Sequence, residues 1–382
     1  MKRAWVFIIV ALSVLSVLTG CLRKPMDNIQ NQEKLYLGYN PLPREFLEFW
    51  FENIEKIRSG ELDPIKFSSD SKLPASSKQI ADTQIILTEP LTDSLPSSYV
   101  APHTPPKDQG QNGTCWAFAT VGSLESALLT QLGPDEIASR YPFLNPYNPD
   151  LSEQFVAYHN LSPSDEENPY QLTVQESNRD TGGNTFFSTF NIIRRGVPEE
   201  KDFPYITDEQ GWIKWNAINE NWKYNLVRPY RTVCIPDFYY YRAVYKDYTT
   251  YINTIKSAIM QYGAVAAMFM VYEDFYDYWW FGTSGKVYIK SPSASSLGGH
   301  AVLIVGWVDN YHDFISGYSG PIWVIKNSWG TVSGFSLSDY GLSSDTTGGY
   351  FALPMLTEDE YNNEQRVDWK VEYYEMYVPV VE

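Results

Sequence analysis

One stretch constrains this 382-residue chain more than any other: residues 107–119, which read Lys-Asp-Gln-Gly-Gln-Asn-Gly-Thr-Cys-Trp-Ala-Phe-Ala. Its polar, glycine-rich first half is typical of a surface loop. The apolar residues that follow recur at helical spacing, at positions 117, 121, 124 and 128, until Leu132-Gly133-Pro134 supplies a stop. The pattern therefore predicts a helix that begins near Thr114 and carries Cys115 in its first turn.

A cysteine in the first turn of a helix is typical of a reactive thiol. The positive end of the helix dipole lowers the pKa of a thiol there, and the thiolate is the nucleophilic form. The alternative is a buried cysteine that packs as a small hydrophobic residue, which is the commoner role of a single cysteine. The loop before Cys115 weakens that alternative, because it predicts a position at the surface.

Two later segments offer partners for the thiolate, which needs a base. Residues 297–307 form an apolar run that predicts a buried strand with His300 at its entry. Residues 321–330 predict a second strand that ends in Asn-Ser-Trp-Gly, where the amide of Asn327 can orient an imidazole. Each residue alone could be structural, but Cys, His and Asn in this order together indicate nucleophilic catalysis.

These motifs resemble those of the papain-like cysteine peptidases over about residues 95–355. The further matches are Leu95-Pro96-Ser97-Ser98, Leu151-Ser152-Glu153-Gln154, Gly182-Gly183, Gly196–Glu200 with Phe203-Pro204-Tyr205, Ile255–Gly263, Asp274-Phe275 and Gly349-Tyr350-Phe351. The resemblance implies an α+β fold of two lobes with a cleft between them. A helical lobe would carry the cysteine, and a β-barrel-like sheet lobe would carry the histidine and asparagine.

The resemblance also implies roles for single residues. Cys115 would be the nucleophile, His300 the general acid and base, and Asn327 the residue that orients His300. The side-chain amide of Gln109 and the backbone N–H of Cys115 would form the oxyanion hole. Substrate-binding residues are expected as well: Gly182 and Gly183 as a flat wall that binds an extended backbone, and Trp329 as a shield over the His300–Asn327 hydrogen bond.

The chain departs from the family pattern in its cysteines. Asn112 stands where the family usually has a disulfide cysteine, and Asp180 stands where its partner is often found. With both replaced, we expect Cys234 to be a buried free thiol. Cys115 and His300 are further apart than the family spacing of about 130–150 residues, which predicts insertions at 134–150, 160–180, 206–250 and 309–320.

The N-terminus is typical of an export signal. Lys2 and Arg3 precede an uncharged run, Trp5–Leu18, and Leu18-Thr19-Gly20-Cys21 resembles the lipobox of bacterial lipoproteins. We therefore predict a signal peptide over residues 1–20, a lipid on Cys21 and an exported protein held at a membrane. The sequence does not distinguish the two membrane leaflets. An uncleaved signal anchor, or a secretory signal with a chance cysteine, are the alternatives.

The rest of the chain divides by composition. Residues 21–42 read as a polar linker. Residues 43–94 contain a predicted amphipathic helix, 43–58, followed by an extended stretch, and could be an inhibitory prosegment or a permanently packed helix with a strap. The peptidase domain would span 95–356. Residues 357–382 form a C-terminal extension, expected to add an edge strand because Pro379 is tolerated there.

Composition excludes several kinds of partner. The net charge of −17 argues against nucleic acid binding. Three cysteines rule out a disulfide scaffold, and four histidines leave little material for a metal cluster. We expect no cofactor, no metal, a peptide or protein substrate, and a monomer. The aromatic runs at 239–241 and 278–281 are expected to pack in the core or against loops rather than line a substrate or sugar groove.

The leading interpretation is a hydrolase, a surface-anchored cysteine peptidase that works through a thioester. One alternative is a non-catalytic papain-like module that holds peptides or glycans. The other is an acyl transferase or transpeptidase, which would use the same three residues but pass the thioester to an amine.

Overall fold

The computed structural model describes residues 37–42, 44, 47, 84–87, 94–159, 161–163, 172–174, 182–207, 220–244, 246–282 and 284–381. The predicted signal peptide, Cys21, most of the predicted helix 43–58 and Asp180 lie outside these ranges. Among the helices that are described, none is long and apolar enough to cross a membrane.

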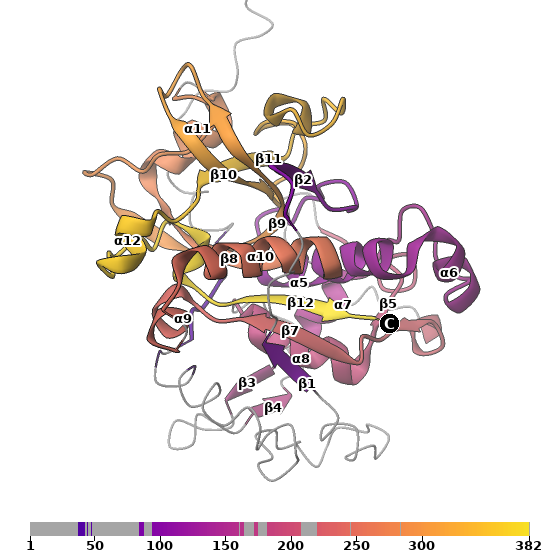
Figure 1. The fold of residues 1–382 in the computed structure, drawn as a ribbon. Helices are drawn as coiled ribbons and strands as arrows, with labels where there is room; N and C mark the ends of the chain where they lie inside the picture. Colours follow the sequence, from indigo (N-terminus) through magenta and orange to yellow (C-terminus); the bar gives the residue numbers. More distant parts are fainter. Residues whose placement is uncertain are drawn as a thin grey trace, which may run out of the picture. The chain divides into compact units, whose positions relative to one another are not determined.

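A mixed sheet forms the centre of the described part of the chain (Figure 1). Its eight strands follow the order β1-β7-β12-β8-β9-β10-β11, with β2 paired to β9, and every pairing except β1 with β7 is antiparallel. The strands are β1 (Gln84–Leu87), β2 (Ser98–Val100), β7 (Arg231–Ile235), β8 (Val265–Tyr272), β9 (Ser296–His312), β10 (Ser319–Lys326), β11 (Tyr350–Pro354) and β12 (Met376–Val380). Two small sheets pair β3 (Leu161–Pro163) with β4 (Leu172–Val174) and β5 (Val197–Pro198) with β6 (Leu226–Val227).

Helices pack against both the sheet and one another. Helix α5 (Cys115–Ala127) contacts β8, β9 and β12, and it also contacts α7 (Glu153–Tyr158) and α8 (Thr185–Arg195). The others are α9 (Phe238–Val244), α10 (Tyr248–Tyr262), α11 (Glu273–Phe281) and α12 (Glu358–Asn362), with short 3-10 turns η4 (Glu220–Lys223), η5 (Leu337–Tyr340) and η6 (Val371–Tyr373). Helices that pack on a largely antiparallel sheet confirm the predicted α+β class.

The predicted start of α5 is confirmed, but at the predicted stop the chain passes into further helical turns instead of leaving helical structure. Thr114 is the N-cap residue and Cys115 is the first residue of the helix. The chain then continues through a π-helical turn, η3 (Leu128–Leu132). Gly133, at φ 71°, ends that turn, and α6 (Gly133–Arg140) begins at once with Pro134 in its first turn. Proline suits this position because the first turn of a helix has no partner for the missing N–H.

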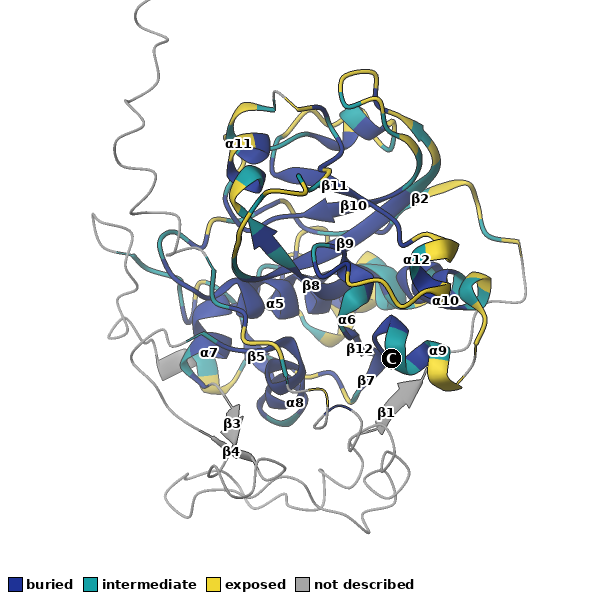
Figure 2. Ribbon diagram, turned by 90° about the vertical axis from the view of Figure 1, so that its left-hand side faces the viewer, coloured by how far each residue is buried: buried dark blue, intermediate teal, exposed yellow. Residues whose placement is uncertain are grey.

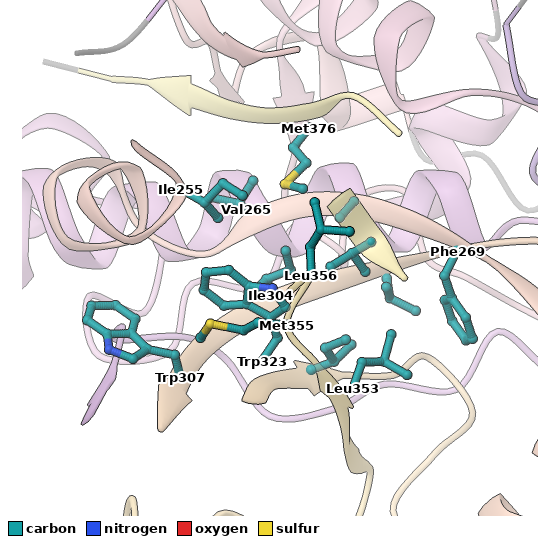
Figure 3. Close-up of a cluster of buried hydrophobic side chains, with 14 of the residues drawn as sticks. Ile255, Val265, Phe269, Ile304, Trp307, Trp323, Leu353, Met355, Leu356 and Met376 are labelled. Atoms are coloured by element: carbon teal, nitrogen blue, oxygen red, sulfur yellow. The ribbon is translucent and has the colours of Figure 1, made fainter. Parts of the chain in front are cut away.

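Both faces of the sheet are buried, which explains its continuous apolar strands. Alternate residues of β8 point to opposite faces: Val265 and Phe269 enter one core, and Ala266 and Met268 enter the other. Figure 3 shows the first core, in which Ile255 of α10 lies beside Val265 of β8. In Figure 2, β8, β10, β11 and β12 are dark blue along most of their length, whereas α9 and α12 carry exposed residues.

The C-terminal extension does not form an edge strand, so that prediction is wrong. β12 lies between β7 and β8, with Pro379 opposite Thr232. The carbonyl oxygen of Pro379 accepts a hydrogen bond from Gln131 Nε2 at 2.9 Å. Because the N–H and C=O of a strand residue point to the same side, the missing N–H of Pro379 also faces Gln131 and removes no bond to β7.

In the runs at 239–241 and 278–281, Tyr241, Tyr278 and Trp279 are buried in the core, whereas Phe281 is exposed. Cys234 is a buried free thiol, as predicted.

Candidate active site

Helix α5 and strand β9 bring Cys115 next to the His300 segment. Cys115 is the first residue of α5, and its Sγ accepts a hydrogen bond from the backbone N–H of Ala301 at 3.4 Å. His300 precedes Ala301 within β9, and both Cys115 and His300 have 0% of their surface exposed. Cys115 and His300, which are 185 positions apart in the sequence, therefore lie together in one buried site.

Asn327 holds the imidazole of His300 from the far side. It follows the last residue of β10, and its Oδ1 lies 2.8 Å from His300 Nε2. The same oxygen accepts the N–H of Ser328 at 2.8 Å, which fixes the orientation of the amide. The ring of Trp329 lies 4.7 Å from the imidazole, centre to centre, and covers it. The other nitrogen, His300 Nδ1, is buried and has no hydrogen-bond partner among the described residues.

Burial controls the charge of this histidine. It lowers the pKa of His300 to about 4, although the hydrogen bond with Asn327 acts in the opposite direction. The imidazole is therefore neutral near pH 7 while the site is covered. A neutral imidazole with Nε2–H bound to Asn327 presents Nδ1 as a proton acceptor.

Gln109 lies in the loop before Cys115, and Asn112 fixes it there. Gln109 Nε2 donates to the carbonyl oxygen of Asn112 at 2.6 Å, and Asn112 Nδ2 donates to the carbonyl oxygen of Gln109 at 3.0 Å. Ser328 Oγ also donates to Gln109 Oε1 at 2.6 Å, which joins this loop to the Asn327 segment. The position where the family usually has a disulfide cysteine thus carries a reciprocal pair of hydrogen bonds instead.

A buried charge network lies behind the site. Lys107 Nζ donates to Glu125 of α5 at 2.9 Å and to Glu153 of α7 at 2.8 Å. Lys326, next to Asn327, donates to the carbonyl oxygen of Thr104 at 2.9 Å, and Thr104 Oγ1 donates to Glu125. A cavity of about 20 Å³ between these residues has room for about one water molecule. The network connects the loop, the two helices and β10 where the site residues meet.

The chain covers this site with its own residues 37–42. Gly183 donates its N–H to the carbonyl oxygen of Gly38 at 2.8 Å, and its carbonyl oxygen accepts the N–H of Asn40 at 2.8 Å. Tyr39 N–H donates to the carbonyl oxygen of Gly299, the residue before His300, at 3.2 Å. Gly183, one of the two glycines predicted to bind a substrate backbone, therefore pairs with a backbone segment of the same chain.

The prediction of a free polar linker over residues 21–42 is wrong for its last part. Gly38 lies so close to Gly113 that a Cβ at Gly38 would be 1.8 Å from the Gly113 carbonyl oxygen. Leu37 packs beside Gly298. Because Tyr39 is also buried, with 3% of its surface exposed, this segment is held by packing as well as by hydrogen bonds.

The side chain of Tyr39 fills a pocket with a polar base. Its hydroxyl donates to Glu375 Oε1 at 3.2 Å, accepts from Asn184 Nδ2 at 3.0 Å and lies 3.5 Å from Thr185 Oγ1. Met268 and Gly299 line the wall beside it. Burial raises the pKa of Glu375 to about 7.

Sequence reasoning missed three parts of this arrangement: the covering segment 37–42, the Lys107 network and Glu375. The last two had a visible signal, since Glu125 interrupts an apolar helix and Glu375 interrupts the apolar pattern of the C-terminal extension. The covering segment had none beyond Gly38 and Tyr39 in a polar stretch. Within the described ranges, no group of three or more His, Cys, Asp or Glu side chains could hold a metal ion.

Comparisons with known proteins agree with these motifs. A model of the papain family of cysteine proteases matches residues 97–139 and 169–336, which together are more than half of the chain. Cathepsin J of Rattus norvegicus is 26% identical over 321 residues, covering 81% of this chain and 75% of that protein. Cathepsin B-like cysteine proteinase 3 of Caenorhabditis elegans is 41% identical over 100 residues, covering 26% of this chain and 23% of that protein.

Among solved structures, the proform of the ragweed pollen allergen Amb a 11, a cysteine protease, aligns with a TM-score of 0.49 and 17% identity. The alignment covers 89% of this chain and 90% of that one. The family match over most of the region that holds Cys115, His300 and Asn327 decides the assignment. This chain belongs to the papain family of cysteine proteases.

Proposed function

We propose that this chain is a peptidase that hydrolyses peptide bonds with Cys115 as nucleophile, His300 as general acid and base, and Asn327 as the residue that orients His300. The convergence of these three residues carries the proposal: Ala301 N–H lies 3.4 Å from Cys115 Sγ, and His300 Nε2 lies 2.8 Å from Asn327 Oδ1. A binding module would need neither an aligned imidazole nor a thiol at a helix N-terminus.

The proposed reaction has two stages. The thiol proton of Cys115 passes to His300 Nδ1, and the thiolate attacks the carbonyl carbon of the substrate. The backbone N–H of Cys115 and the amide of Gln109 stabilise the negative oxygen, and His300 then returns its proton to the leaving amine. Water attacks the resulting thioester, which releases the acid product and restores the thiol.

The described form would be latent, since residues 37–42 occupy the position of a substrate backbone along Gly183 and Gly299. Displacement of this segment would expose Cys115 and hydrate His300. Hydration would raise the pKa of His300 from its value of about 4, and so favour a thiolate–imidazolium pair. The segment lies upstream of residues 43–94, where the sequence suggested a prosegment.

A full-length Gly38→Leu variant should open the site, because the new side chain would collide with the backbone of Gly113. We expect a thiol-directed epoxide peptide mimic to label Cys115 in this variant at least tenfold faster than in the parent chain. Cys234 serves as an internal control, since burial raises its pKa well above that of an ordinary thiol. Pro41→Ala, at an exposed position of the same segment, is the matched control.

Labelling should disappear when His300→Ala is added to Gly38→Leu. If the opened and folded variant is not labelled at Cys115, or is labelled equally without His300, the proposed catalysis is wrong. Incubation of the opened variant with a peptide substrate and an added amine then separates hydrolysis from acyl transfer, since only a transferase gives the amide product.

We further propose that the protein is exported and anchored to a membrane by a lipid on Cys21. The basic start, the apolar run and Leu18-Thr19-Gly20-Cys21 support this proposal. Mass spectrometry of the protein from bacterial membranes should find an N-terminal peptide that begins with acylated Cys21. An intact Met1, or an unmodified Cys21, would contradict it.

A further inference from the structure

The tip of the hairpin between β9 and β10 carries two large apolar side chains in water. β9 ends at His312 and β10 begins at Ser319, so residues 313–318 form the tip. Phe314 has 88% of its surface exposed, and Ile315 has 65%. Among the residues whose exposure is described, they are the only two large apolar residues that are both exposed and adjacent in the sequence. Single exposed apolar residues are ordinary on a protein surface, whereas neighbouring ones indicate a contact with a partner.

The tip is a preorganised turn. One carboxylate oxygen of Asp313, which has 3% of its surface exposed, accepts the N–H of Lys286 at 2.7 Å and of Val287 at 3.1 Å. These bonds fix the tip to a neighbouring segment. The other oxygen accepts the N–H of Ile315 at 3.1 Å. Gly317, at φ 73°, donates its N–H to the carbonyl oxygen of Asp313 at 2.8 Å and closes the turn. The fold therefore spends a buried carboxylate on holding two exposed apolar side chains in one place.

We propose that this tip is a membrane-contacting loop, in which Phe314 and Ile315 insert into the boundary between the headgroups and the acyl chains of a lipid bilayer. Two side chains at a hairpin tip are far fewer than the roughly 20–30 residues that each side of a stable protein interface supplies. A bilayer needs no complementary surface, and burial of any apolar side chain in that boundary is favourable. The size of the exposed apolar cluster therefore favours a lipid surface over a protein partner.

The hydrogen bonds of the tip reduce the cost of entering that boundary. A backbone N–H that leaves water without another partner is expensive to bury. At the tip, the N–H of Ile315 is already bonded to Asp313 Oδ1, and the N–H of Gly317 is bonded to the carbonyl oxygen of Asp313. Asp313 is also the only acidic residue in the stretch 312–319, and its side chain is buried. Insertion of the two apolar side chains would leave these N–H groups paired.

Charge does not favour this contact, so the contact should be apolar in character. The chain carries a net charge of −17, and Lys286, which is bonded to the tip through its backbone, is paired with Asp339 at 2.7 Å. Insertion should therefore survive about 0.5 M salt, which screens exposed charges but not apolar contacts. The inference goes beyond the proposed lipid on Cys21: the tip would orient an anchored molecule against the bilayer, and its insertion does not depend on the lipid.

The test places a fluorophore on the tip of the full-length chain, reconstituted in phosphatidylcholine vesicles through its N-terminal apolar run. Ile315→Cys, combined with Cys21→Ser and Cys115→Ala, leaves one reactive thiol, because burial raises the pKa of Cys234 well above that of an ordinary thiol. The matched control carries the fluorophore at Val244→Cys, an exposed position at the end of α9. Nitroxide groups on the lipid acyl chains should quench the tip fluorophore about threefold more strongly than the control, because only the tip would reach the acyl chains.

Phe314→Asp, added to the tip-labelled chain, should lower the ratio of inserted to free tips about tenfold or more, because a charge replaces an apolar contact. Tyr224→Asp, which places the same charge at a similarly exposed aromatic residue, should leave the quenching unchanged. Both positions are exposed, so neither substitution should alter urea unfolding.

Quenching at the tip that equals quenching at Val244→Cys, or that Phe314→Asp does not reduce, would overturn the inference. A change in tip fluorescence that requires an added membrane protein would also overturn it, and would assign the tip to a protein partner. The labelled chains lack the proposed lipid and the proposed nucleophile, so neither outcome bears on the proposed function.

Discussion

The hydroxyl of Tyr39 donates a hydrogen bond to Glu375 across 336 residues of sequence, at 3.2 Å. This bond joins the covering segment to the residue that immediately precedes β12, the strand between β7 and β8. The backbone of Tyr39 is bonded to Gly299, the neighbour of His300, so one residue contacts both the His300 segment and Glu375.

Loss of the Tyr39 hydroxyl should weaken the binding of residues 37–42 over the site. Tyr39→Phe removes the bonds to Glu375 and Asn184, each worth roughly 0.5–1.5 kcal/mol, and leaves both partners buried. We expect epoxide labelling of Cys115 in the otherwise unchanged full-length chain to accelerate by about tenfold. Pro41→Ala should label at the parental rate. Labelling of Tyr39→Phe at the parental rate would show that the hydroxyl does not hold the segment.

Glu375 should make stability fall as the pH rises. Its pKa is about 7 in the folded chain and 4.5 is its ordinary value, so between these values the folded state keeps a proton that the unfolded state has lost. By linkage, the free energy of unfolding should decrease by roughly 3 kcal/mol over that window. Urea unfolding at pH 5 and pH 7.5 should show that Glu375→Gln lacks this loss, whereas exposed Asp277→Asn keeps it. A parental pH dependence in Glu375→Gln would contradict the assignment.

Removal of the Asn327 amide should impair catalysis more than folding. In the opened Gly38→Leu chain, Asn327→Ala should lower kcat/KM by roughly a hundredfold, because the imidazole loses the acceptor that fixes its tautomer and orientation. Peptide hydrolysis measures the effect, and exposed Asn363→Ala is the control. Unchanged kcat/KM in Asn327→Ala would exclude the orienting role.

The Lys107 network should be a large contributor to stability. Lys107→Met removes the cation that bonds directly to the buried Glu125 and Glu153, and breaking a buried ion pair costs about 3–5 kcal/mol. Urea unfolding should show this loss. Lys201→Met breaks a pair with Glu199 in which the lysine is mostly exposed, and should change the free energy of unfolding by less than about 1 kcal/mol. Equal effects of the two variants would contradict the prediction.

Local patterns predicted the elements that carry the site well. Helical spacing after Thr114 placed Cys115 in the first turn of α5, and the apolar runs around His300 and before Asn327 became β9 and β10. Such patterns succeed because the periodicity of a helix or strand, and the residue that caps a helix, are set within a few residues of sequence.

The same reasoning failed where distant segments meet. Pro379 suggested an edge strand, yet β12 lies inside the sheet. Proline is tolerated there because its carbonyl faces Gln131 rather than a neighbouring strand. Residues 37–42 were predicted as linker because polar composition depends only on neighbouring residues. The fit of Gly38 against Gly113, in contrast, joins two segments that are far apart in the sequence.

The sequence by itself determined the order of the chemical groups: a thiol at a helix start, an imidazole in a buried strand, and an amide after the next strand. Only the tertiary structure decided that Ala301 contacts Cys115, that residues 37–42 cover the site, and that the hydroxyl of Tyr39 meets Glu375. The reason is that periodicity and capping depend on neighbours along the chain, whereas these contacts depend on packing between segments up to 336 residues apart.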